Sequence, residues 1–377
     1  MNKIGLVSPH SDPNFGTMLQ AYALSKVIVK LGFYAEYIRY RPTVPKSFHQ
    51  KLHSYVVDPF KIIKRYKTIT TNKSIDNYDY FNSEEFKITK QEFEAFRIKH
   101  IPTSSILFDP KTIGSISGYS KYIVGSDQTW SPYLYKKNTI NFLEFVKDNS
   151  LKNSYAPSFG TTRIPDWYLP ILKEKLKDYN LISCREEKNC KKISSLINKK
   201  VYHVLDPTLL LQQNDYQEIE IKIHIPSKFI LCYILGEKDC ISEYAEALGK
   251  RKNIPVYYVA TRPKYLKKEK IFSNIGPGHL IYLINNAETI ITDSFHGTIF
   301  SINFQKDFYS FTKRLSTSTI NDNSRISDFL QLINLQDRLK DDNDRTENTD
   351  IDYSKIEKII QVKRKESIKY LQGILKQ

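Results

Sequence analysis

Short apolar runs that stop at polar or glycine residues recur along the chain, with helical spacing between several of them. Residues 4–7 predict a strand, residues 17–31 carry apolar side chains at helical spacing up to Gly32, and residues 33–40 predict a second strand. Such a unit builds parallel, doubly wound sheets, in which ligands collect at the carboxyl ends of the strands. The intervening turn at 8–17 is therefore a candidate wall of a site, although it is not a GxGxxG fingerprint.

The same alternation continues through the rest of the sequence. Further strands are predicted at residues 121–124, 140–146, 181–184, 201–205, 229–235, 256–260, 289–292 and 307–311. Helices are predicted at residues 167–179, 241–250, 277–287 and 298–304. Parallel strands present the residues that follow them to a shared rim, so several strand ends of this kind imply one crevice.

The length of 377 residues exceeds the roughly 250–300 at which single cores stop growing, so the α/β pattern predicts two domains. Residues 212–227 lose the alternation and read as a linker between a first domain at 1–211 and a second at 228–345. Residues 43–100, rich in Lys, Tyr and Phe, read as a helical or irregular insertion on the acceptor side. A helical tail at 353–377 is expected to pack across both domains.

The segment at 289–304 combines a run that is β-branched and apolar enough for a buried strand with a polar turn and a second apolar run. If the second run is a helix, Ser294 is a suitable N-cap and Gly297 lets a ligand approach the backbone amides. Such a helix start is the local design of an anion site, and His296 adds a group that titrates near neutral pH. The alternative is a plain strand-to-helix turn with a surface histidine.

The net charge of +16 and the pI near 9.3 indicate an anionic partner. No nucleic-acid module is recognisable, so nucleic acid is not expected, and a lipid-linked phosphate acceptor or a phosphorylated substrate fits better. Hydrophobic residues at 40% and aromatic residues at 13% exclude a disordered chain.

The four cysteines, which show neither a CxxC pair nor zinc spacing, read as buried thiols of a reducing compartment: Cys184, Cys190, Cys232 and Cys240. No metal-binding pattern is present in the sequence. The amino terminus leads directly into a strand, and no run approaches the 18 or so apolar residues that a spanning helix requires. We therefore expect a cytoplasmic protein.

Six sequence blocks occur in order over most of residues 1–335: NFGTMLQAYAL at 14–24, VGSDQTW at 124–130, YAPSFG at 155–160, ISCREE at 182–187, VLDPTLLL at 204–211 and TDSFHGTIFSINF at 292–304. Together they resemble the polysaccharide pyruvyl transferase family. The resemblance implies two Rossmann-like domains that face a cleft, similar to glycosyltransferases of the B type. It also implies transfer of pyruvate from phosphoenolpyruvate to a sugar as a cyclic ketal, with release of phosphate.

The resemblance also implies a sugar acceptor. This acceptor would belong to a bacterial surface polysaccharide, such as a capsule or exopolysaccharide, or to its lipid-linked precursor. Phosphoenolpyruvate enters as the donor substrate, and no cofactor is expected. Work on a lipid-linked acceptor implies peripheral contact with the inner face of the cytoplasmic membrane. Two alternatives remain open, which are a nucleotide-sugar-dependent glycosyltransferase of the same architecture and a non-catalytic glycan-binding relative.

Ketal formation needs a cationic clamp for the donor, a proton donor for its C3 and a base near the acceptor. Arg185 is the candidate clamp, because a guanidinium grips a carboxylate or phosphate at two points. The alternative for Arg185 is a surface ion pair with Glu186 or Glu187. His296 is the candidate for phosphate contact or proton transfer, and the alternative is a hydrogen bond to Asp293.

The remaining donor-side candidates are the helix start and basic residues near it, which could equally be solvated surface groups: Ser294, Gly297, Thr298, Lys313 and Arg325. Polar or aromatic residues at the first and fourth strand ends are the acceptor-side candidates: Asn14, Gly16, Gln20, Gln128 and Trp130. Trp130 would stack on a sugar, although a core tryptophan is the commoner case.

Asp127 is the candidate general base, and a turn or N-cap residue is the alternative. Some branches of the family carry Asn-x-Gly-Asp in the first turn, and Thr17 stands where that aspartate would be. A role given to that aspartate cannot be transferred to this chain, which increases the weight on Asp127.

Overall fold

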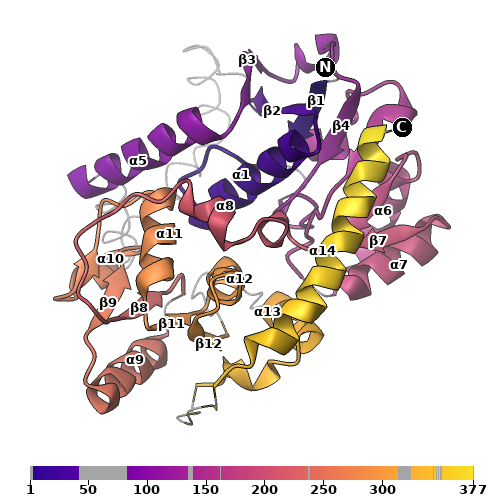
Figure 1. Cartoon of the computed structure of the whole chain (residues 1–377). Coiled ribbons are helices and arrows are strands. Elements are labelled where there is room, and N and C mark those ends of the chain that lie inside the picture. Colours follow the sequence, from indigo (N-terminus) through magenta and orange to yellow (C-terminus); the bar gives the residue numbers. More distant parts are fainter. Residues whose placement is uncertain are drawn as a thin grey trace, which may run out of the picture.

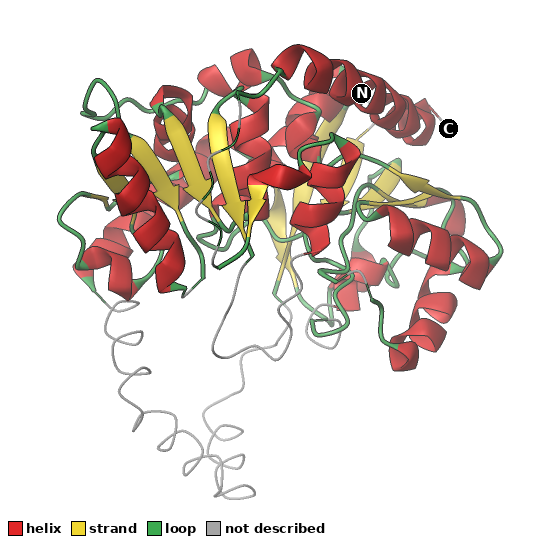
Figure 2. Cartoon of the chain, turned by 90° about the horizontal axis from the view of Figure 1, so that it is seen from below, coloured by secondary structure: helices red, strands yellow, loops and turns green. Residues whose placement is uncertain are grey.

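The computed structural model describes residues 3–41, 83–134, 139–161, 163–236, 238–312, 324–342, 344, 346, 348 and 350–376. Within these residues two sheets of parallel strands lie side by side, one in each half of the chain (Figure 1). Figure 2 shows the strands between layers of helices. The predicted fold class is confirmed: the chain is an α/β protein with two Rossmann-like parallel sheets.

The first sheet has the order β3-β2-β1-β4-β5. Its strands are β1 (Lys3–Val7), β2 (Tyr34–Tyr40), β3 (Thr103–Phe108), β4 (Lys121–Val124) and β5 (Lys152–Ser154). Next to β5, at the Asn153–Leu181 bridge, follow β6 (Ile182–Cys184) and β7 (Val201–His203). The helices of this half are α1 (Phe15–Lys30), α5 (Glu84–His100), α6 (Leu169–Leu176), α7 (Glu187–Ile197) and α8 (Gln213–Gln217).

The second sheet has the order β10-β9-β8-β11-β12-β13. Its strands are β8 (Ile230–Tyr233), β9 (Val256–Val259), β10 (Ile271–Phe272), β11 (Thr289–Thr292), β12 (Asp307–Phe311) and β13 (Leu339–Lys340). The helices of this half are α9 (Asp239–Lys252), α10 (Pro263–Leu266), α11 (Pro277–Asn286), α12 (Phe295–Asn303) and α13 (Ser324–Leu332).

Helix α1 lies between the two halves, since it is buried over most of Phe15 to Ile28 and contacts α11 of the second half, while its last two residues are exposed. Asn14 caps its start by accepting a hydrogen bond from the amide of Thr17 at 3.1 Å, and Gly32, with φ of +89°, follows its end. The central strands β4, β8 and β11 are buried at every position, as expected for strands with helices on both faces. The first turn of α1 is thereby fixed between the sheets.

Helix α14 (Tyr353–Lys376), yellow in Figure 1, contacts both halves. In the first half, the Tyr370 hydroxyl donates to the carbonyl of Ser154 at 2.9 Å, and the Ser367 hydroxyl accepts from the amide of Leu205 at 2.9 Å. In the second half, the Tyr353 hydroxyl donates to the carbonyl of Lys306. The helix therefore joins the two sheets on the side where β7 ends.

One predicted strand and the predicted state of two cysteines are wrong. The apolar run at 140–146 forms a short 3₁₀ turn (Thr139–Phe142) and a loop instead of a strand, since Phe142 and Leu143 pack into the core as single side chains. Cys184 and Cys190 are joined by a disulfide across six residues instead of being free thiols. Of the predicted insertion, α5 is described, whereas residues 42–82 lie outside the described residues.

Candidate active site

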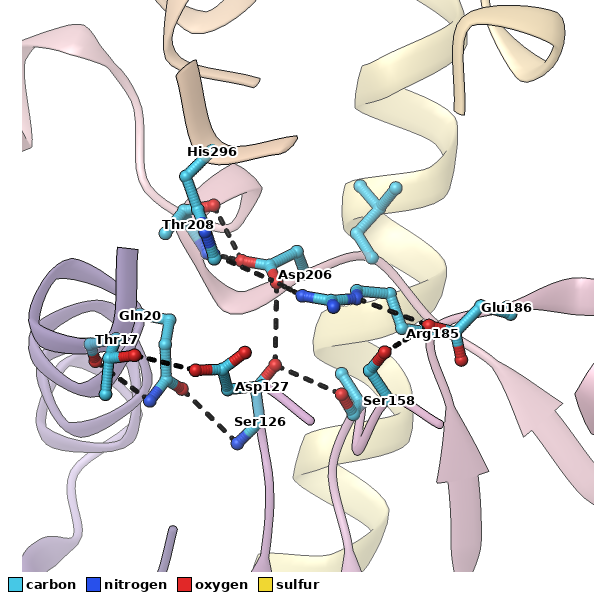
Figure 3. A network of polar contacts seen from close by, with 12 residues as sticks. Thr17, Gln20, Ser126, Asp127, Ser158, Arg185, Glu186, Asp206, Thr208 and His296 are labelled. Atoms are coloured by element: carbon cyan, nitrogen blue, oxygen red, sulfur yellow. Dashed lines mark hydrogen bonds and ion pairs between the residues drawn. The ribbon is translucent and has the colours of Figure 1, made fainter. Parts of the chain in front are cut away.

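Asp206, three residues after the end of β7, is the carboxylate on which the two halves converge (Figure 3). Its Oδ1 accepts hydrogen bonds from the amide and hydroxyl of Thr208, at 3.0 and 2.7 Å. Its Oδ2 lies 2.5 Å from Nη1 of Arg185, from the first half, and 3.8 Å from Nε2 of His296, from the second. Arg185 and His296 therefore lie close together although 110 residues of sequence separate them.

Charge compensation keeps this buried cluster ionised. Burial raises the pKa of Asp206, but His296, Arg185 and Thr208 outweigh it and hold that pKa well below its usual range. Burial likewise lowers the pKa of Arg185, and the carboxylates of Asp206, Glu186 and Asp127 more than reverse this effect. Asp206 is thus an anion and Arg185 a cation in the folded protein.

Arg185 presents one edge to its partner and leaves another edge for a ligand. Nη1 bonds Asp206, whereas Nε, 3.8 Å from Glu186, and Nη2 have no hydrogen-bond partner among the described residues. The guanidinium lies 4.4 Å from the ring centre of Phe295, and Arg325 lies 5.7 Å from the same ring. An Nε–Nη2 edge is the geometry that binds a carboxylate or phosphate at two points.

The start of α12 has the predicted cap, but a Cβ at Gly297 would meet Thr292 Oγ1 at 2.3 Å and Tyr233 at 3.0 Å, so this glycine faces the core and the prediction that it admits a ligand is wrong. Ser294 accepts from the amide of Gly297 at 3.2 Å, while the Thr298 hydroxyl is buried between Ser294 and Ser310. Asp293 accepts from the amides of Leu235 and Gly236 at 2.6 and 2.7 Å. The carboxylate that faces His296 is consequently Asp206 from the other half.

The first turn of α1 lies directly against His296. A Cβ at Gly16 would lie 2.1 Å from Nδ1 of His296, so only glycine fits there. The next residue, Thr17, donates its hydroxyl to Oδ2 of Asp127 at 2.7 Å. Gln20 is wholly buried, and its amide links the carbonyl of Pro9 to the backbone amide of Ser126.

The loop after β4 carries Asp127 into the same region. Gly125 has φ of +126°, and a Cβ there would lie 2.0 Å from the carbonyl oxygen of Tyr155. Asp127 itself has φ of +63°, and its carbonyl accepts from the amide of Ser158 at 2.7 Å. With its amide oxygen turned toward Arg325, Gln128 accepts from that guanidinium at 3.0 and 3.2 Å.

Several predicted acceptor residues are placed differently from the expectation. Trp130 is 0% exposed and donates its indole N–H to the carbonyl of Asn141, so it is a core residue and the prediction that it stacks on a sugar is wrong. Gln20 accepts a hydrogen bond from the amide of Ser126 in the loop after β4, and Gly16 packs against His296. Lys313 lies outside the described residues.

A cavity of 330 Å³ opens beside Arg185. The start of α7 and the segment after β7 form one of its sides, and α12 and α13 form the other. It is lined by both charged and apolar side chains, among them Arg185, Lys188, Lys191, Asp206, Phe295 and Arg325. Its size and mixed lining suit a small charged ligand.

Two residues of this arrangement were missed by sequence reasoning. Asp206 follows a strand and precedes Pro207, and that position in the VLDPT block was the available signal. Phe295 lies inside the TDSFHG block, but nothing local indicates that its ring contacts two arginines. Both contacts join distant segments, which spacing along one segment does not reveal.

Within the described residues, no group of three or more His, Cys, Asp or Glu side chains is arranged to hold a metal ion. None of the described helices is both long and apolar enough to cross a membrane.

Comparison with known proteins gives a family match and several structural likenesses. The family model described as polysaccharide pyruvyl transferase matches residues 14–312. No curated protein matches the sequence.

Solved structures with a similar fold include UDP-GlcNAc 2-epimerase from Methanocaldococcus jannaschii, with 10% identity, a TM-score of 0.46 and coverage of 95% of this chain and 91% of that chain. The Neisseria meningitidis UDP-GlcNAc 2-epimerase bound to UDP-GlcNAc has 11% identity and a TM-score of 0.46, and the match covers 99% of this chain and 100% of that chain. Acinetobacter baumannii MurG has 9% identity, a TM-score of 0.40 and coverage of 100% of both chains.

Proposed function

The chain belongs to the polysaccharide pyruvyl transferase family, and from this membership we propose that it transfers pyruvate from phosphoenolpyruvate to a sugar residue, forming a cyclic ketal and releasing phosphate. The observation that carries the proposal is the convergence of Arg185 and His296, from opposite halves, on the buried Asp206. A dianionic three-carbon donor requires a fixed cation and a nearby proton donor, and these residues offer both.

In the proposed mechanism, Arg185 binds the donor. Asp206 and the ring of Phe295 hold the guanidinium, so its Nε–Nη2 edge is oriented before the donor arrives. Arg325, 5.7 Å from the centre of the same Phe295 ring, adds a second positive charge for the donor. The start of α12 offers backbone amides and the positive end of the helix dipole to the phosphate.

His296 supplies the proton in this mechanism. Its imidazolium gives a proton to C3 of the enol, so that the methylene becomes a methyl group and C2 becomes oxocarbenium-like. Asp206, 3.8 Å from Nε2, stabilises the charged imidazole in the way that a carboxylate supports a catalytic histidine. A sugar hydroxyl then attacks C2, phosphate leaves with its bridging oxygen, and a second hydroxyl closes the ketal ring.

Asp127 is the proposed base for the acceptor hydroxyls. Thr17 donates a hydrogen bond to one oxygen, Oδ2, which fixes the orientation of the carboxylate. The two hydroxyls lose one proton each, while C3 gains one and the released phosphate carries the other, so the protons balance. Asn14 and Gln128 remain the proposed acceptor-side amides.

The acceptor proposed here is a lipid-linked oligosaccharide of a surface polysaccharide, and the place of action is the inner face of the cytoplasmic membrane. The net charge of +16 supports this proposal, because basic proteins are attracted to anionic lipid surfaces.

The proposal is tested by incubating the protein with phosphoenolpyruvate and candidate acceptor glycans, then measuring phosphate release and the mass of the acceptor. We expect a product heavier by one pyruvyl ketal. Arg185→Ala and His296→Ala should abolish turnover, whereas Lys177→Ala, a change at an exposed lysine, should not. Saturation by a sugar nucleotide, without any response to phosphoenolpyruvate, would instead favour a glycosyltransferase.

One further variant separates the proposed roles of the donor-side and acceptor-side residues. Asp127→Asn should leave phosphoenolpyruvate binding unchanged and slow the transfer step, because the carboxylate is assigned to the acceptor. Loss of donor binding in this variant would contradict the assignment of Asp127.

A further inference from the structure

A second cavity, of 220 Å³, lies at the carboxyl ends of β8, β9 and β10. The first turn of α1 and one face of α5 close it from the other half of the chain. Aromatic rings form much of its wall, with Phe15 centred 4.8 Å from Phe93 and 5.8 Å from Tyr233. The cavity is thus an aromatic-walled space between the two sheets, separate in its lining from the cavity beside Arg185.

The wall of this cavity is polar in places but uncharged. Its described lining residues include no Asp, Glu, Lys, Arg or His, in a chain whose net charge is +16. The polar groups come from Thr261, Ser273 and Asn274, which follow β9 and β10, and from Asn14. The amide oxygen of Asn274 is buried and has no hydrogen-bond partner among the described residues, and such an atom is costly unless a donor reaches it.

The first turn of α1 connects this cavity to the reaction site. Asn14 and Phe15 line the cavity, Gly16 touches the imidazole of His296, and Thr17 binds Asp127. These four residues are consecutive, so a ligand in the cavity lies one helical turn from the groups assigned to proton transfer.

We propose that this cavity binds one uncharged sugar ring of the acceptor, an inference that rests on the proposed function. Aromatic faces pack against the apolar face of a sugar ring, and a few hydroxyl and amide groups fix its orientation. The absence of cations from the described lining argues against a phosphate or carboxylate at this place. The volume lies below the range for drug-sized ligands, so a single ring fits better than an oligosaccharide.

The test measures binding without phosphoenolpyruvate, by saturation-transfer NMR titrations with methyl galactoside, N-acetylglucosamine and N-acetylmannosamine, and with uridine for comparison. Thr89→Trp, on the cavity face of α5, fills the space, and Gln91→Trp, at an exposed position of the same helix, is its matched control. Asn274→Gly removes the amide oxygen while allowing the φ of +56° at this position.

We expect at least one of the sugars to bind the wild-type protein and Gln91→Trp equally, with affinity about tenfold or more weaker for Thr89→Trp. Asn274→Gly should weaken binding by about two- to tenfold, the range for one neutral hydrogen bond. The inference is overturned if no sugar binds, if both cavity variants bind as the wild type does, or if uridine alone binds.

The proposed function and this inference fail differently. If sugar binding depends on the cavity but phosphoenolpyruvate yields no phosphate with any acceptor, the inference holds and the proposed reaction fails. If phosphate release and ketal formation proceed in Thr89→Trp at the wild-type KM for the acceptor, the reaction stands and the acceptor ring binds elsewhere.

Discussion

At Gly16 the chain has no space for a side chain, because a Cβ there would lie only 2.1 Å from Nδ1 of His296. Gly16→Ala must therefore push His296 away from Asp206 or shift the start of α1. We expect turnover to fall by about 10²-fold, since small displacements of a catalytic group have effects of this size. Initial rates of phosphate release measure it.

The matched control for this change is Gly114→Ala, because a Cβ at Gly114 has no heavy atom within 4 Å. Circular dichroism of both variants should match the wild type. Equal activity in the Gly16 and Gly114 variants would show that the contact with the first turn of α1 does not position His296.

Asp206 makes a different residue-scale prediction, about stability. Asp206→Asn leaves the buried Arg185 without its anion, so we expect the free energy of unfolding to fall by about 3–5 kcal/mol near pH 7. Urea denaturation followed by fluorescence measures this change. Asp166→Asn, at a side chain that is 88% exposed, is the control and should unfold as the wild type does. A loss no greater than that of the control would mean that Asp206 and Arg185 do not depend on each other.

Sequence reasoning reached some of these residues and not others for a physical reason. Arg185 and His296 stand at strand ends inside recognisable blocks, so their importance was predictable. That Asp206 lies between them depends on how two sheets meet, which no local spacing encodes. Trp130 shows the opposite error, because an aromatic residue beside a candidate base has the same local sequence whether it faces a cleft or the core.

At the scale of elements, the buried parallel strands were predictable because helices cover both of their faces and the strands therefore read as continuous apolar runs. The same signal misled at residues 140–146, where a short apolar run packs as a turn. Periodicity does not separate these two cases when the run is short. The helical spacing of α14 was legible, whereas its hydrogen bonds to both halves follow only from the tertiary structure.

The contacts of α14 predict that its buried face stabilises the whole chain. Leu371 is 0% exposed in the main hydrophobic core, so Leu371→Ala should lower the free energy of unfolding by about 2–5 kcal/mol. Val362→Ala, on the same helix at a position that is 56% exposed, should have little effect. Similar denaturation midpoints for the two variants would show that α14 contributes little to stability.

At the scale of the whole molecule, the site exists only when the halves are held together. The first half contributes Arg185, Asp206 and Asp127, while His296 and Phe295 come from the second. Folding of each sheet alone would leave the Asp206 cluster incomplete. Conditions that loosen the contact between the halves should therefore reduce stability and activity together.

Low pH should lower the stability of the folded chain, because burial lowers the pKa of His10, His203 and His279 below the ordinary value of 6.5. Below pH 6.5 the unfolded chain takes up protons at these imidazoles before the folded protein does. Since the unfolded state then binds more protons, the free energy of unfolding should fall as the pH falls from 6.5, and recover as it rises again. Protonation of Asp206 adds a further loss only in stronger acid, because its pKa is depressed from 3.8. Urea denaturation at pH 7.5, 6.5 and 5.5 measures how the free energy of unfolding depends on pH. His203→Gln should make this dependence weaker. A free energy of unfolding that stays constant or increases toward pH 5.5 would contradict the buried neutral state of these histidines.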